Sequence, residues 1–270
     1  MYVQPYDSSN RIAAEPLFVS PEMDLAILKL DDASAFGDMV PLPFMTETPP
    51  LRSAVQVYGY PKGGAAMSIT EGIVSRIEYA NYSFGARGLR IQVDAALNPG
   101  NSGGPAIVDQ EVVGLVYSRL RTGDNIGYLI PGEEIQTFLD DVADGNHDGK
   151  PVVREVFQKL QNDALRQRFG LTTDQTGMVV IKTNKMDDEY PLKVDDVLTH
   201  VGDYDIDNEG MVRLESGLRL AFPYFVPKLT GEDGTFPATI IRGGESMTVR
   251  VPTGQKPVSV IDSLKGDYPE

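Results

Sequence analysis

Short apolar runs separated by glycine, proline and polar turns fill the first half of the chain. The runs that alternate or stay apolar cover residues 54–60, 69–77, 89–93, 112–118 and 126–130. Many short strands with frequent turn signals are typical of an all-β barrel or sandwich. After Pro131 the period changes, and apolar residues recur at helical spacing: Ile135, Phe138, Leu139 and Val142. The pattern predicts a β domain over residues 1–142 that ends in a helix.

A second domain is predicted at residues 156–262, after a polar, glycine-rich linker at 143–155. Its pattern is α+β. We expect a short helix at 164–169 that stops at Gly170, a strand at 177–182, and a helix from Gly217 that prolines interrupt. A hairpin is expected at 238–252, turning at Gly243–Gly244.

Composition excludes several classes of protein. The chain has 270 residues and a net charge of −15, without a cluster of Lys or Arg, so nucleic acid and anionic membrane surfaces are not expected partners. It has no cysteine, which excludes disulfides and thiolate metal sites. No apolar run approaches the ~18 residues of a membrane span. A globular protein of two medium domains is the expectation.

The segment from Asn98 to Pro105 carries the first chemical signal. It sets Ser102 among glycines, between two apolar strand patterns. Glycine permits a tight turn and a close approach of substrate. The segment also fits the G-x-S-x-G elbow of α/β-hydrolases, but that motif needs a helix after the serine. Here a strand pattern follows, and the candidate acid precedes the serine, so the hydrolase elbow is not favoured.

Asp24 is that candidate acid, at the mouth of an apolar strand pattern. A serine triad also needs a histidine, and none precedes Asp24. The chain has two histidines, His147 and His200. His147 lies in a polar Asp/Gly stretch and is predicted to be a surface residue of the linker. His200 is predicted to be an ordinary strand residue of the second domain.

Four segments resemble the HtrA/Deg family of serine proteases and occur in the family's order. They are MDLAILKL (23–30), YGYPKGG with SITEGIVSRIE (58–64 and 68–78), IQVDAALNPGNSGGPAI (91–107) and NIGYLIP (125–131). The resemblance covers nearly the whole chain. It implies a mostly β protein: a trypsin-like (chymotrypsin-fold) double β-barrel, followed by a PDZ-like α+β domain. The family's histidine lies before the Asp segment, so we expect this chain to begin after it, with the first barrel incomplete.

The resemblance also implies site roles. Ser102 would be the nucleophile and Asp24 the acid that orients the base. Gly100, Asn101 and Ser102 would form the oxyanion hole. The substrate pocket would have Ala96 at its base, with walls from Val116, Tyr117, Gly127 and Tyr128. Because Ala96 is not an acid, a buried Lys or Arg of the substrate would have no partner. Small or medium aliphatic residues are therefore expected before the scissile bond.

The function implied is a serine endopeptidase that cleaves unfolded or damaged polypeptides through an acyl-enzyme. The chain by itself lacks the triad base and is expected to be inactive alone. The alternative is a non-catalytic peptide-binding pseudoprotease or PDZ scaffold. Polypeptides are the expected partners, and a homo-oligomer is possible. The resemblance favours an extracytoplasmic (periplasmic) location, and no cofactor is needed.

Two further motifs lie near the linker. Asp144, Asn146, Asp148 and Glu155 fit the spacing of a calcium loop, but Pro151 and the single copy argue against it, and no metal is predicted. PDZ domains capture a C-terminal carboxylate with a backbone nest. The corresponding segment, 149–153, has one glycine, and Pro151 removes a donor, so carboxylate capture is in doubt.

Overall fold

The computed structural model describes residues 1–6, 8–61, 66–81, 87–119, 127–185 and 187–254. The chain divides into two compact units, Met1–His147 and Asp148–Glu270. The division falls inside the predicted linker at 143–155. Each unit is described by itself below.

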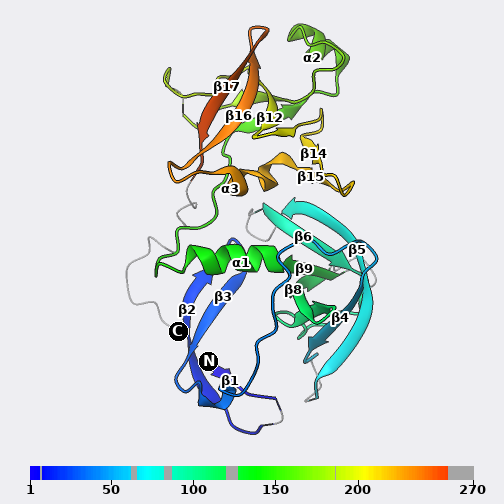
Figure 1. Ribbon diagram of the computed structural model, residues 1–270, viewed down its shortest axis with the longest axis vertical. Helices are drawn as coiled ribbons and strands as arrows, with labels where there is room; N and C mark the ends of the chain where they lie inside the picture. Colours follow the sequence, from blue (N-terminus) through cyan, green and yellow to red (C-terminus); the bar gives the residue numbers. More distant parts are fainter. Residues whose placement is uncertain (7, 62–65, 82–86, 120–126, 186, 255–270) are drawn as a thin grey trace. The chain divides into compact units, whose positions relative to one another are not determined.

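The first unit contains a closed antiparallel barrel with strand order β4-β5-β6-β9-β8-β7 (Figure 1). Its strands are β4 (Ala54–Gly59), β5 (Ser68–Asn81), β6 (Arg87–Val93), β7 (Pro105–Val108), β8 (Glu111–Arg119) and β9 (Gly127–Pro131). These elements confirm the mostly β prediction. The strand β7 directly follows the Ser102 loop, as expected for a barrel and unlike a hydrolase elbow.

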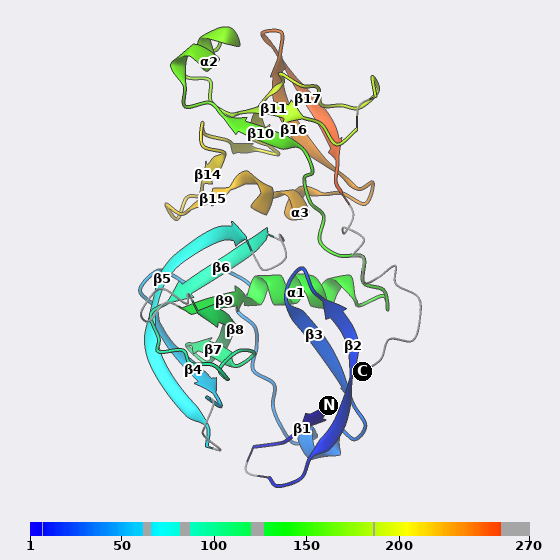
Figure 2. The same cartoon turned by 180° about the vertical axis from the view of Figure 1, so that it is seen from behind.

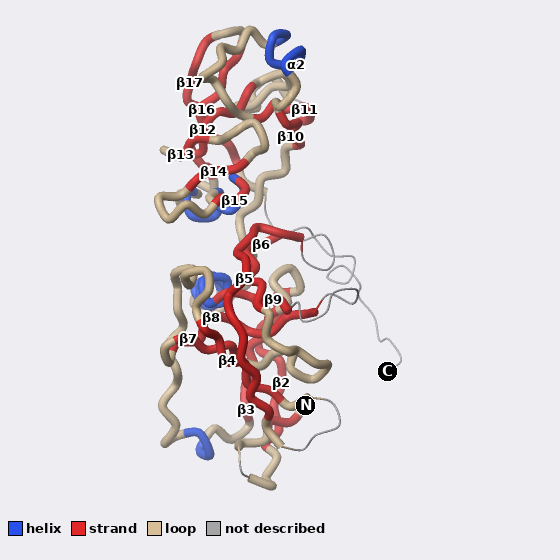
Figure 3. The backbone as a smooth tube through the Cα atoms, turned by 90° about the vertical axis from the view of Figure 1, so that its right-hand side faces the viewer, coloured by secondary structure: helices blue, strands red, loops and turns tan. Residues whose placement is uncertain are grey.

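A separate three-stranded sheet precedes the barrel: β1 (Tyr2–Val3), β2 (Ile12–Ser20) and β3 (Leu25–Leu30). Figure 3 shows β2 and β3 in the lower part of the tube. A short 3-10 helix, η1 (Ser34–Phe36), follows it. On one face of this sheet Leu17, Val19 and Leu28 are exposed. The three strands do not close a barrel of their own.

Helix α1 (Gly132–Asp141) lies beside β2 and β3 and follows β9 directly (Figure 2). Ile135 and Phe138 of α1 share a buried cluster with Leu25 of β3 and Ile130 of β9. Met23, which is 1% exposed, enters the same cluster from the turn before β3. One core therefore joins the N-terminal sheet to the barrel.

The second unit is built on the sheet β10-β11-β12-β16-β17, with β13 paired to β12 and a separate β14-β15 pair. Its strands are β10 (Val156–Lys159), β11 (Met178–Lys182), β12 (Val197–Val201), β13 (Tyr204–Asp205), β14 (Met211–Arg213), β15 (Arg219–Ala221), β16 (Thr235–Arg242) and β17 (Glu245–Pro252). The hairpin β16–β17 turns at Gly243–Gly244, as predicted.

Helix α2 (Asp163–Arg168) confirms the predicted short helix. The Asn162 side chain accepts a hydrogen bond from the Leu165 N–H at 3.1 Å, and Gly170 ends the helix at φ +63°. The helix predicted from Gly217 is wrong at its start. Residues 219–221 form β15 instead, followed by η3 (Phe222–Tyr224) and α3 (Val226–Leu229). Leu220 is fully buried in β15, and Pro223 and Pro227 confine the helices to single turns.

Candidate active site

Ser102 lies in the loop between β6 and β7, and its side chain is exposed. The backbone N–H groups of three neighbouring residues in this loop already donate hydrogen bonds. Asn101 donates to Asn98 O (3.0 Å), Gly103 to Val116 O (2.8 Å) and Gly104 to Asn101 O (2.9 Å). The N–H groups of Gly100 and Ser102 have no acceptor among the described residues. An exposed hydroxyl is therefore flanked by two N–H groups without an acceptor in the described structure, and an oxyanion hole is built from such donors.

Two glycines fix the shape of this loop. Gly100 has φ +104°, a conformation that side chains rarely adopt. A Cβ atom at Gly104 would lie 2.1 Å from the carbonyl oxygen of Tyr58 on β4. The loop after Ser102 is thus pressed against the neighbouring strand. A larger residue at position 104 would push the Ser102 turn out of place.

Tyr117, on β8, connects the serine to a buried cation. The Ser102 hydroxyl donates to the Tyr117 carbonyl at 3.5 Å, a long hydrogen bond. The Arg90 guanidinium carbon lies 4.5 Å from the centre of the Tyr117 ring. Arg90 itself is only 2% exposed. A cation–π contact of this kind is strengthened when water is excluded.

Burial lowers the pKa of Arg90 to about 9, although electrostatic interactions with Glu134, Tyr117 and Asp24 act to raise it. The guanidinium therefore stays charged at neutral pH. Glu134 of α1 is buried and accepts the Leu89 N–H at 2.9 Å, while Arg90 donates to the Leu89 carbonyl at 3.1 Å. Asp24 lies within electrostatic range of this group. Arg90 and Glu134 were missed in the sequence, where the only signal is a basic residue inside an apolar strand pattern.

Asp24 occupies the last position of the turn between β2 and β3, and it is exposed. Its φ is +57°, which is uncommon for a residue with a side chain. The preceding residue, Met23, is buried, and its N–H donates to Ser20 O at 3.2 Å. The acid is thus held in a strained conformation beside an anchor in the core.

The five residues of the predicted substrate pocket are differently placed. Ala96 is exposed, Val116 is 4% exposed, and Tyr117 and Tyr128 are half-buried. The Tyr128 hydroxyl accepts a hydrogen bond from Arg76 at 3.2 Å. A Cβ at Gly127 would meet the Leu97 side chain at 2.1 Å.

A larger groove of about 1010 Å³ lies beside Ser102. Its lining includes Gly100, Ser102, Tyr58, Tyr60 and Met67, and none of the five predicted pocket residues. Sequence reasoning missed this groove. The pocket assignment stays a prediction.

The prediction for His147 is wrong, because the side chain is 10% exposed rather than a surface group. It contacts Glu22 and Asp141 inside the first unit. His200 lies on β12, as expected, with its Nε2 2.8 Å from Asp205. Within the described residues, the ionic contacts of the two histidines are with Glu22, Asp141 and Asp205, and not with Ser102 or Asp24.

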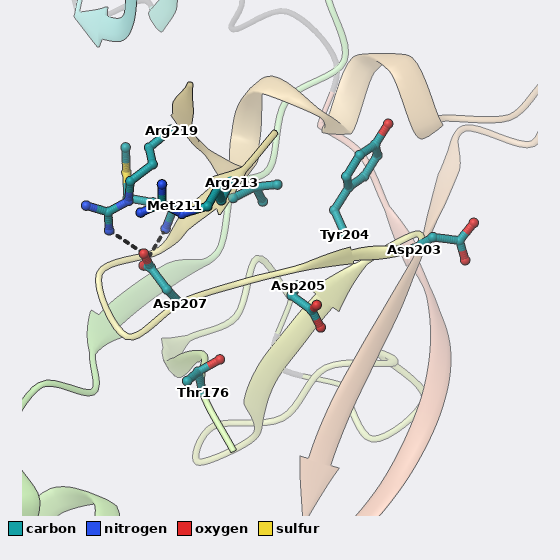
Figure 4. Close-up of a pocket in the computed structure, with 9 residues that line it drawn as sticks. Thr176, Asp203, Tyr204, Asp205, Asp207, Met211, Arg213 and Arg219 are labelled. Carbon is teal, nitrogen blue, oxygen red and sulfur yellow. Dashed lines mark hydrogen bonds and ion pairs between the residues drawn. The ribbon is translucent and has the colours of Figure 1, made fainter. Parts of the chain in front are cut away.

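The second unit has a hollow of about 320 Å³ beside β13, β14 and β15 (Figure 4). Asp207 at its edge accepts the N–H groups of Glu209 and Met211, both at 2.9 Å, and the Arg219 guanidinium. Burial opposes a lower pKa at Asp207, but these hydrogen bonds outweigh it and the pKa falls below its usual value. The hollow carries charges of both signs, so it does not favour one ionic ligand.

The calcium-loop residues do not form a common site. Glu155 is 7% exposed and accepts the hydroxyl of Tyr190 within the second unit. In the described part of the chain, no group of His, Asp and Glu side chains is arranged to hold a metal ion. None of the helices described there is long and apolar enough to cross a bilayer.

Comparisons with known proteins agree with this fold. The family model described as a trypsin-like peptidase domain matches residues 3–115. The chain is 36% identical over 248 residues to "Protease Do-like 4, mitochondrial" of Arabidopsis thaliana, covering 91% of this chain and 48% of that protein. It is 37% identical over 186 residues to "Serine protease DegP homolog" of Plasmodium falciparum (isolate 3D7), covering 67% of this chain and 21% of the relative.

The fold is also similar to a solved structure, "HtrA-type protease AlgW with tripeptide". The TM-score is 0.72 at 20% identity, over 96% of this chain and 82% of that one. This likeness shows the fold alone. The chain spans about half the length of the first Arabidopsis relative.

Proposed function

The first unit of this chain is a trypsin-like domain of the HtrA/Deg family. From that premise we propose that it is the catalytic domain of a serine endopeptidase. The observation that carries the proposal is the Ser102 loop. Its hydroxyl is exposed, and the Gly100 and Ser102 N–H groups have no acceptor among the described residues. Hydrogen-bond donors that are already in place for the oxyanion need no rearrangement during the reaction. Their stabilisation of the transition state is often the largest contribution to acyl-transfer catalysis.

In the proposed reaction Ser102 Oγ attacks the peptide carbonyl and forms the acyl-enzyme. The carbonyl oxygen becomes negatively charged and accepts hydrogen bonds from the N–H groups of Gly100 and Ser102. A histidine takes the serine proton and passes it to the leaving amine. Neither His147 nor His200 contacts Ser102 in the described structure, so the proposal requires a histidine from elsewhere, whose tautomer Asp24 would hold. The 3.5 Å contact to the Tyr117 carbonyl supports this by holding the hydroxyl before substrate arrives.

The proposed substrates are unfolded or damaged polypeptides with a small or medium aliphatic residue before the cut. Ala96 at the pocket base offers no charge to a basic side chain. A peptide library digested by the native protease should give cleavage after Val, Ala or Ile. Preferential cleavage after Lys or Arg would contradict the assignment of Ala96.

A fluorophosphonate probe tests the nucleophile directly. We expect the native protease to be labelled at Ser102 and the Ser102→Ala variant to be unlabelled. Ser75→Ala is the matched control, because Ser75 is also an exposed serine of the first unit. The intact mass of the protein from its native source completes the test: a mass well above 29.5 kDa allows for a segment that supplies the histidine.

A rival function is peptide binding without cleavage. The observation that favours it is that the two histidines of this sequence, His147 and His200, contact carboxylates other than Asp24 in the described structure. Removing a triad histidine costs several orders of magnitude in rate. On this alternative the native protein has the mass of this chain and leaves the probe unreacted.

For the second unit we propose a PDZ-like role in which an extended peptide adds to β10, an edge strand of its sheet. In the segment where a nest would lie, the Val152 N–H already donates to Gly254 O at 3.4 Å. Glu155, directly before β10, has a buried Oε2 without a hydrogen-bond partner in the described structure. A free C-terminal carboxylate is disfavoured beside that charge. Peptides with amidated and free C-termini should therefore bind with similar affinity, or the amide more tightly.

We also propose an extracytoplasmic location, either periplasm or organelle lumen, and a homo-oligomer. The names of two relatives support this proposal: one from Rickettsia conorii is described as periplasmic and one from Arabidopsis thaliana as mitochondrial. Cell fractionation tests the location. Light scattering on the native protein tests the oligomer.

A further inference from the structure

His147 is clamped between two carboxylates near the end of the first unit. Its Nδ1 lies 2.5 Å from Asp141 Oδ2 at the end of α1, a short hydrogen bond. Its Nε2 lies 3.1 Å from Glu22 Oε1, in the turn between β2 and β3. The second contact lacks hydrogen-bond alignment and acts as an ion pair when the imidazole carries both protons. His147 thus ties the turn to the helix.

The imidazole is also packed against the core. Its ring meets the Phe138 ring edge-on, with centroids 5.4 Å apart. Phe138 is 2% exposed and shares its cluster with Met23, the residue after Glu22. The side chains of His147, Glu22 and Asp141 are 10%, 20% and 15% exposed. Ionic contacts this far from water are screened less than surface pairs.

The clamped turn is the one that ends at Asp24. Glu22 and Met23 immediately precede Asp24, whose φ of +57° is strained for a residue with a side chain. Such a conformation persists only where the surroundings fix it. Met23 fixes the turn from inside the core, and His147 fixes it from the side through Glu22.

We propose that His147 is a positioning residue for Asp24, acting through Glu22, and that it fastens the acid's turn to the place where the chain leaves the first unit. The chain passes into the second unit directly after His147. Tension on that segment would therefore reach the turn of Asp24. The catalytic part of this inference rests on the function proposed above, whereas the anchoring part does not.

Hydrogen exchange measured by mass spectrometry on the 270-residue chain tests the anchor. His147→Phe keeps a ring against Phe138 and removes both polar contacts. Amides of residues 22–25 should exchange about tenfold faster in this variant, because the turn opens more often. His200→Phe is the matched control, since His200 also pairs with an aspartate. In the control the same amides should be unchanged.

Glu22→Ala removes the other end of the contact and serves if His147→Phe folds poorly. The double variant should exchange no faster than either single variant, because both remove one interaction. Additive effects, or unchanged exchange in the turn, would overturn the anchor.

Kinetics on the native protease separate positioning from general stability. In the proposed reaction Asp24 acts on the histidine and not on the substrate, so His147→Phe should lower kcat about tenfold and leave KM within about twofold. Faster exchange with an unchanged kcat would overturn the positioning role. If the wild-type protein neither cleaves peptides nor reacts with a fluorophosphonate, the proposed function fails, and the exchange measurement alone decides the anchor.

Discussion

The guanidinium of Arg90 lies on the ring of Tyr117, 4.5 Å from its centre, and Tyr117 offers its carbonyl to Ser102 at 3.5 Å. The buried Arg90 cation and the candidate nucleophile Ser102 thus contact the same residue, Tyr117. The same cation lies in the field of Glu134 and of Asp24. Packing at the base of the barrel and electrostatics at the candidate site are therefore linked through a single residue.

Replacing Arg90 by Met should destabilise the first unit by about 3 kcal/mol, because the buried Glu134 would lose the electrostatic interaction with the Arg90 charge. Urea unfolding measures this loss. Arg90→Met combined with Glu134→Gln should recover part of the stability, since the buried negative charge is removed together with the positive one. If Arg90→Met alone is as stable as the wild type, Arg90 and Glu134 are not energetically coupled.

Alanine substitutions at two adjacent glycines of the Ser102 loop should have different effects on stability. Gly104→Ala places a Cβ 2.1 Å from the Tyr58 carbonyl oxygen and must displace backbone. Gly103→Ala meets no atom within 4 Å and only strains φ +81°. We expect Gly103→Ala to cost about 1–2 kcal/mol and Gly104→Ala clearly more. Thermal unfolding compares them, and equal losses would contradict the close contact with β4.

Met23→Ala should destabilise the first unit by about 3 kcal/mol, as expected for a fully buried side chain that leaves a cavity. Met39 is 51% exposed and supplies the control. Met39→Ala should change the free energy of unfolding by less than about 0.5 kcal/mol. Denaturant midpoints for the two variants decide the matter, and a small effect at Met23 would argue against its place in the core.

Acid should weaken the second unit through Asp207. Its pKa in the folded protein lies below the ordinary value of 3.8, so its ion pair and hydrogen bonds stabilise the unit above that pH. This contribution is lost as the pH falls through the lowered pKa. Asp207→Asn should therefore lose less stability on acidification below pH 3.8 than the wild type. Circular dichroism measures it, with the exposed Asp203→Asn as a control that should behave like the wild type.

Strands and turns were largely predictable, because alternating apolar positions and glycine–proline signals are local. The Ser102 loop was predictable for the same reason, since its conformation depends on glycines within it. His147 was not, because its burial depends on Glu22, which is far away in sequence. Arg90 was also missed, since only the folded barrel shows that its position is buried. The helix expected from Gly217 failed where burial of Leu220 in a strand outweighed helical spacing.

The packing of Met23 couples the thermal stability of the candidate site to that of the whole first unit. The residue that fixes the turn of Asp24 belongs to the same cluster as α1, β3 and β9. The turn keeps its anchor in the core as long as that cluster is intact, and the cluster does not survive the cooperative melting of the domain. Heat inactivation and global melting should therefore share one temperature, so that the working range of the site ends where the fold itself ends.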